Sequence, residues 1–128
     1  MFDERMSMRN IGGNAGLELH DSEVERIEED AGHVSLVLAG YIHRSHGVPG
    51  VAVGSVWSQC ARINVSRGSV LGAFASYPAQ LWGGTLVSAA EEIDNVIPVP
   101  ASFQGPVRVK LIAMSGEVIV VEGEAAEL

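Results

Sequence analysis

Apolar and polar positions alternate over several short stretches of this chain, and this alternation predicts β-strands. The strand expected at 33–44 carries these apolar side chains on one face: Val34, Leu36, Leu38 and Ile42. In the strand expected at 55–66, the apolar side chains on one face are Trp57, Ala61, Ile63 and Val65. A polar opposite face in the second stretch is typical of a half-buried strand in an antiparallel sheet.

A hairpin is predicted at the C-terminus, with strands at 107–114 and 117–122 joined by a two-residue turn at Ser115-Gly116. This register places Leu111 opposite Val120. The face that it directs into the core consists of Val109, Leu111, Ala113, Val118 and Val120. A slip of one residue would exchange the faces, because side chains alternate along a strand.

The rest of the chain is divided by glycine, proline and turn residues. We expect strands on both sides of Asp30-Ala31-Gly32, a loop at 45–54, and an irregular connection at 67–83. We also expect a short strand at 85–87 and a helical turn at 89–94. The prolines make 97–100 an edge strand or an extended loop.

These elements predict an all-β protein, an antiparallel sandwich or partly open barrel of about six or seven strands. The chain has 128 residues, a common size for one domain. We expect a flexible N-terminal arm at 1–16 and a single β domain at 17–128.

Composition and charge narrow the classes of partner. The formal net charge is −8, which disfavours binding to nucleic acid and to anionic membranes. No stretch approaches the roughly 18 apolar residues of a membrane-spanning helix. A single cysteine permits no internal disulfide, and the first ten residues lack the apolar core of a secretory signal. We therefore expect a cytoplasmic protein.

Seven carboxylates lie between Glu18 and Asp30. Such a run is usually a solvated face of a strand. The alternative is a docking surface for a basic protein partner, since complementary charge steers association.

The segment His43-Arg44-Ser45-His46, with His20 or His33, offers the residue types of a zinc site. Positions three apart on a strand face opposite sides, so His43 and His46 converge only if the chain bends at Ser45. The competing interpretation is a solvated strand end that runs into a glycine-rich loop. We therefore predict no metal and no cofactor.

His20-Asp21-Ser22 contains the residue types of a hydrolytic triad, but neighbouring residues rarely adopt its geometry. Asp21 and Ser22 are better explained as side chains that accept hydrogen bonds from nearby backbone donors and fix a turn after Leu19. The alternative is ligand contact through His20. Trp82, beside two glycines, is the candidate for an exposed aromatic contact.

Several short segments together resemble a recurring pattern among small, uncharacterised bacterial β proteins. They are Leu19-His20-Asp21-Ser22, Gly83-Gly84-Thr85-Leu86, Asn95-Val96-Ile97-Pro98-Val99-Pro100 and Gly105-Pro106-Val107. Some proteins of this kind are presumed immunity proteins that accompany bacterial toxins. The resemblance implies an all-β fold and, in one version, an immunity-like role.

The sequence leaves two functions open. The first is a non-enzymatic binding or protein-interaction module, plausibly a homodimer, with His20, Asp21, His43, His46 and Trp82 as candidate binding residues and no catalytic residue assigned. The alternative is a small metal-dependent enzyme or ligand binder that uses His20, His43 and His46. Convergence of these histidines in one pocket would favour the alternative.

Overall fold

The computed structural model describes residues 14–45 and 54–128, and these residues form nine strands and no helix. The first strands are β1 (Asn14–Asp30), β2 (His33–Ser45), β3 (Gly54–Ser66), β4 (Ser69–Leu71) and β5 (Ala79–Ser88). They are followed by β6 (Glu92–Asp94), β7 (Val96–Pro98), β8 (Ser102–Ala113) and β9 (Val118–Glu127). The expected all-β class is confirmed, and this part of the chain contains no helix long and apolar enough to cross a membrane.

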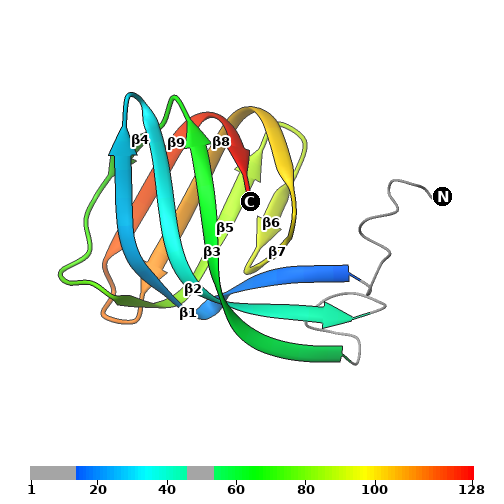
Figure 1. The fold of residues 1–128 in the computed structure, drawn as a ribbon. Helices are drawn as coiled ribbons and strands as arrows, with labels where there is room; N and C mark the ends of the chain where they lie inside the picture. The colour runs from blue at the N-terminus through cyan, green and yellow to red at the C-terminus, as the bar shows by residue number, and fades with distance from the viewer. Residues whose placement is uncertain (1–13, 46–53) are drawn as a thin grey trace.

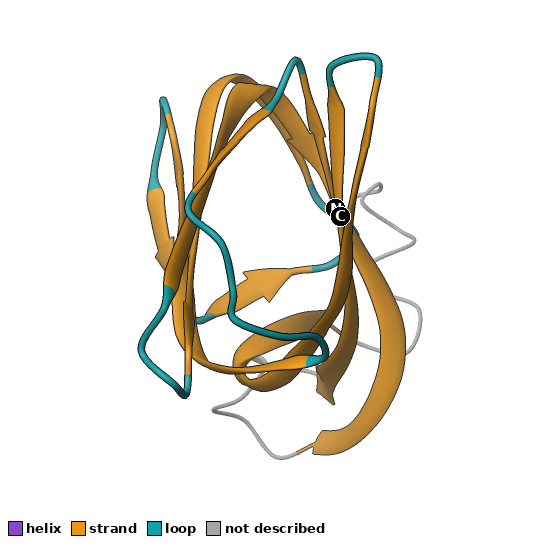
Figure 2. Cartoon of the chain, turned by 90° about the vertical axis from the view of Figure 1, so that its left-hand side faces the viewer, coloured by secondary structure: helices purple, strands orange, loops and turns teal. Residues whose placement is uncertain are grey.

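Six strands close into an antiparallel barrel (Figures 1 and 2). Their order around the wall is β1, β2, β3, β9, β8 and β5, and β5 pairs with β1 to complete the circle. Closure pairs each strand of the wall with a neighbour on both sides, whereas a sandwich or an open barrel must protect its edge strands in other ways.

The remaining strands and strand ends lie outside this circle. β4 pairs with β9, β6 with β5, and β7 with the start of β1. At one end β1, β2 and β3 run past the barrel together and form an extension (Figure 1). The residue ranges that pair in this extension are 14–18, 41–45 and 54–58.

The core is filled by the alternating apolar positions of all six barrel strands. Val34, Leu36, Leu38 and Ile42 are buried, as the pattern of residues 33–44 predicts. Buried side chains from the other five strands include Leu19, Val24, Ile63, Val65, Leu81, Leu86, Val109, Leu111, Ile119 and Val121.

The C-terminal hairpin is confirmed, but its predicted register is wrong by one residue. β8 and β9 pair Leu111 with Ile119, where the sequence placed Val120. The predicted face of β8 is buried. On β9, the barrel buries Ile119 and Val121 in place of the expected Val118 and Val120.

The turn explains this slip. The Ala113 carbonyl accepts the Gly116 N–H at 2.9 Å, and the Ala113 N–H donates to the Glu117 carbonyl at 2.9 Å. The loop therefore has three residues, and its last, Gly116, has a φ of 101°. A glycine in the left-handed region is typical of three-residue hairpin loops. One added loop residue shifts all pairs of the hairpin by one.

Other boundaries also differ from the sequence prediction. Residues 79–83 belong to β5, although they were expected in an irregular connection, and 92–94 form β6, where a helical turn was expected. Residues 79–83 gain ladder partners from β1 and β8, which are distant in sequence, and local pattern does not reveal such partners. Residues 92–94 pair with β5, the preceding strand, in a short hairpin. Residues 14–16 belong to β1 and not to an arm. Residues 97–98 form part of an edge strand, as their prolines predict.

A bulge of four residues bends β1 at the expected turn after Leu19. Glu18 pairs with Tyr41 and Glu23 with Ala39, so the four residues 19–22 face only Gly40 on β2. Such bulges bend a strand and increase its twist. Asp21 has a φ of 73°, a conformation that Asp adopts more readily than most residues.

Ser22 holds this bulge together. It is fully buried, and its hydroxyl donates to the Glu18 carbonyl at 2.5 Å and accepts the Tyr41 N–H at 3.1 Å. Ser22 therefore fixes the chain after Leu19, but its partners are Glu18, before the bulge in β1, and Tyr41 on β2, and not the backbone donors two or three residues on. The Asp21 carboxylate is exposed, and none of the described hydrogen bonds joins it to a backbone donor.

We predict that Ser22→Ala lowers the free energy of unfolding by about 1–3 kcal/mol, because the Tyr41 N–H and the Glu18 carbonyl lose a buried partner. Chemical denaturation would measure the change. Ser58→Ala, at an exposed position of β3, is the control and should stay within about 0.5 kcal/mol of the parent. Equal stability of the two variants would contradict the role assigned to Ser22.

Candidate functional site

The barrel closes through a short ladder between β1 and β5. Only two residue pairs join these strands, Glu23 with Gln80 and Val24 with Ala79. Beyond them β1 enters its bulge and the strands separate. The segment between β6 and β7 reaches into this gap.

Asn95 bridges the gap with three hydrogen bonds. Its carbonyl accepts the Leu19 N–H at 2.8 Å, and its side-chain Oδ1 accepts the His20 N–H at 2.8 Å. Its own N–H donates to the Gly84 carbonyl at 3.0 Å. Asn95 has a φ of 65°, which Asn tolerates better than most side chains.

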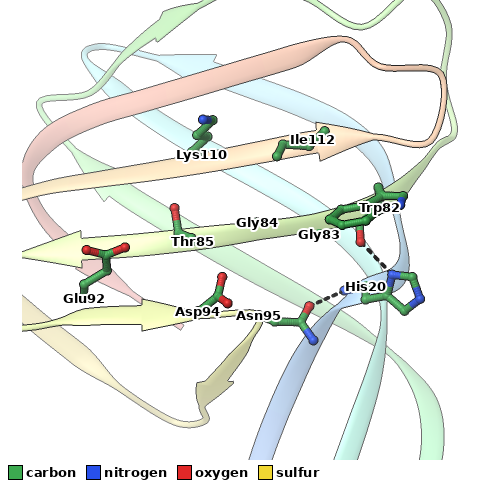
Figure 3. A pocket seen from close by; sticks show the side chains of 10 residues that line it. All are labelled: His20, Trp82, Gly83, Gly84, Thr85, Glu92, Asp94, Asn95, Lys110 and Ile112. Carbon is green, nitrogen blue, oxygen red and sulfur yellow. Dashed lines mark hydrogen bonds between the residues drawn. The ribbon is translucent and has the colours of Figure 1, made fainter.

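His20 and Trp82 meet beside this bridge (Figure 3). His20 Nδ1 lies 2.6 Å from the Trp82 carbonyl oxygen, and the two rings make a T-shaped contact with centroids 6.2 Å apart. Because a carbonyl oxygen only accepts, this hydrogen bond requires a proton on Nδ1. Nε2 lies 3.6 Å from Asp21 Oδ2.

The two rings border a pocket of about 490 Å³ on the outside of the barrel (Figure 3). Its other lining residues come from β5, β6, β8 and the bridge: Gly83, Gly84, Thr85, Glu92, Asp94, Asn95, Lys110 and Ile112. A volume of this size is within the range of small-molecule sites. Trp82 is 61% exposed, the largest value for any large apolar residue in the described part of the chain.

Two glycines give the pocket its floor, for different reasons. A Cβ on Gly84 would lie 2.5 Å from the Lys110 carbonyl oxygen and 2.9 Å from Leu19 Cδ1, so close packing requires glycine there. A Cβ on Gly83 would meet no atom within 4 Å outside its neighbours Trp82 and Gly84. The missing side chain at Gly83 therefore leaves room for a ligand.

Four polar side chains of the pocket are unengaged. Within the described residues, no hydrogen bond or ion pair involves the side chains of Thr85, Glu92, Asp94 or Lys110. Strand pairing places Thr85 beside Lys110 on one side and beside Asp94 on the other. An acceptor, a hydroxyl and a donor thus lie in a row across three strands.

Only some of the residues singled out from the sequence meet here. His20 and Trp82 line the pocket, with Asp21 beside His20, and Trp82 lies in β5 and not in the expected loop. His43 does not line it. Its Nε2 lies 2.5 Å from Glu18 Oε1 in the extension. His46 lies outside the described residues, in which no cluster of three potential metal ligands occurs.

Two arginines partly compensate the negative charge of the acidic run between Glu18 and Asp30. Glu28 accepts from Arg26 at 2.7 Å and from Arg62 at 3.0 Å on the exposed face of β1 and β3. The hydrogen bond from Arg26 lowers the pKa of Glu28, and the same bond raises the pKa of Arg26. A basic partner at this face would have to compete with two arginines.

Sequence reasoning did not assign Asn95, Thr85, Glu92, Asp94 or Lys110 to a site. One local signal was present at Asn95, because Asn between two short apolar segments often adopts a left-handed conformation. The other four are ordinary polar residues of strands. Only the pairing of β5, β6 and β8 brings them together.

We predict that the Asn95 bridge contributes to stability through its side-chain oxygen and its backbone conformation. Asn95→Ala should cost most, about 2–3 kcal/mol, because it removes the acceptor of the His20 N–H and places Ala at a positive φ. Asn95→Gly should lower the free energy of unfolding less, because it removes only the acceptor of the His20 N–H. Asn95→Asp should lower it least, because it keeps a side-chain oxygen that can accept this hydrogen bond. Thermal unfolding of the three variants tests this order, and equal losses would refute it.

Comparison with known proteins found no family model, curated protein or solved structure that matches this chain.

Proposed function

We propose that this protein is a non-enzymatic binding module whose ligand site is the Trp82 pocket, which is lined by the ten residues drawn in Figure 3. The observation that carries the proposal is the exposed indole of Trp82 next to the empty space above Gly83. A large apolar ring exposed beside a polar hollow is typical of a recognition surface.

The arrangement supports binding better than the alternative of a metal-dependent enzyme. His20 Nδ1 is engaged by the Trp82 carbonyl, and His43 is engaged by Glu18 away from the pocket. Two histidines that lie in different places do not make a common site for a metal or a substrate. Diverse polar groups around one aromatic ring instead suit the orientation of a bound molecule.

Gly83→Val provides a test that leaves the fold intact. The valine side chain would extend into open space, and a β-branched residue suits a strand. We predict that the variant unfolds at or slightly above the temperature of the parent, because it reduces the freedom of the unfolded chain. The same side chain should block the pocket.

The binding assay uses four small probes: methyl glucoside, choline, acetate and glycylglycine. Proton–nitrogen NMR would follow the indole N–H of Trp82, identified by its loss in Trp82→Ala. At least one probe should shift this resonance in the parent and leave it unchanged in Gly83→Val. If no probe shifts it, or if the shifts persist in Gly83→Val, the pocket is not a ligand site.

A further inference from the structure

The chemistry of the pocket also indicates what kind of ligand it takes. This inference about the ligand rests on the proposed function, because it concerns the same pocket. Three features limit the class of ligand that the pocket can bind: the charge of the lining, the spacing of its polar groups and the position of Trp82.

The charge of the lining suits a neutral ligand. Glu92 and Asp94 contribute two negative charges and Lys110 one positive charge, which gives a formal charge of −1 with His20 neutral. An anion would lie close to two carboxylates, and a simple cation would lie close to the lysine. A ligand without charge meets neither repulsion, and it avoids the cost of removing an ion from water.

The polar groups suit a ligand that both donates and accepts hydrogen bonds. The carboxylate of Asp94 accepts, the ammonium of Lys110 donates, and the hydroxyl of Thr85 between them does both. Neighbouring strands lie about 4.8 Å apart, so the backbones of Asp94 and Lys110 are separated by about 10 Å. This distance leaves space for one six-membered ring with its hydroxyl groups between the two side chains.

Trp82 supplies a flat apolar surface beside this row, three residues before Thr85 along β5 (Figure 3). One face of many ring sugars consists of C–H groups, and such a face packs on an indole ring while the hydroxyls at the edge of the sugar remain free to bind polar groups. The open space above Gly83 lies next to the indole (Figure 3). His20 contacts the indole of Trp82 edge to face.

We propose that the Trp82 pocket binds a neutral saccharide, with Trp82 as the stacking surface and with Asp94, Thr85 and Lys110 as hydrogen-bonding partners of its hydroxyls. A single ring is expected to bind with a dissociation constant on the order of 1 mM, because few atoms are buried in an open site. Longer chains that extend along β5 would bind more tightly.

The test is a titration of the full chain with neutral sugars, followed by the Trp82 indole N–H resonance. The probes are methyl glycosides of glucose, galactose, mannose and N-acetylglucosamine, and the disaccharides maltose and cellobiose. At least one should bind, with at least tenfold weaker affinity in Trp82→Ala. Thr85→Val, which replaces the hydroxyl by a methyl group of similar size, should weaken binding about threefold to tenfold.

Tyr41→Ala is the matched control, because Tyr41 is a 40% exposed aromatic residue that does not line the pocket. In this variant the indole N–H of Trp82 remains available as the reporter. Its sugar affinity should equal that of the parent. Loss of affinity in Tyr41→Ala, or retention in Trp82→Ala as measured by calorimetry, would overturn the saccharide proposal.

The outcomes separate this inference from the proposed function. If choline, acetate or glycylglycine shifts the Trp82 resonance in a Gly83-dependent manner and no sugar does, the pocket is a ligand site but the saccharide assignment is wrong. If neither the sugars nor these three probes produce a Gly83-dependent shift, both proposals fail. Binding of a sugar that depends on Trp82 and Thr85 supports both.

Discussion

The hydrogen bonds of Asn95 join β1 to β5 at the place where the direct ladder between these strands ends. Without them, two residue pairs would hold the barrel closed at this seam, and the backbone N–H groups of Leu19 and His20 would lack their partners. Buried or half-buried backbone donors need such partners. The bridge also requires that β1 turn away from β2, and the bulge fixed by Ser22 provides that turn.

The same seam creates the pocket. Because β1 and β5 separate there, His20 and Trp82 lie at the margin of the gap and contact each other instead of following a regular ladder. The short strand β6 adds two carboxylates on the outer side of β5, and β8 adds Lys110. The binding surface is thus a consequence of how the barrel closes, and its rigid elements hold polar groups at fixed spacing.

Three of the four short segments that suggested a resemblance to other small β proteins meet at this seam. Leu19-His20-Asp21-Ser22 forms the bulge, Gly83-Gly84-Thr85-Leu86 forms the floor of the pocket, and Asn95 begins the third segment and bridges the other two. Each contains a residue whose backbone or packing is demanding: Asp21 and Asn95 have positive φ, and Gly84 lies against the Lys110 carbonyl. Because the three segments lie together, they share one structural role, the formation of the seam between β1 and β5. The sequence of any one segment does not reveal this role.

The sequence by itself determined the all-β class, the buried face of β2, and the existence of the C-terminal hairpin. These features depend on alternation of apolar residues and on turn residues, which are local properties. The tertiary structure decided the hairpin register, the strands at residues 79–83 and 92–94, and the position of Asn95 between β1 and β5. One residue in a loop reverses a strand's faces, and pairing between distant strands depends on the closure of the whole barrel. Neither effect is encoded in the periodicity of a single segment, so only the folded chain reveals the pocket that Trp82 and His20 share.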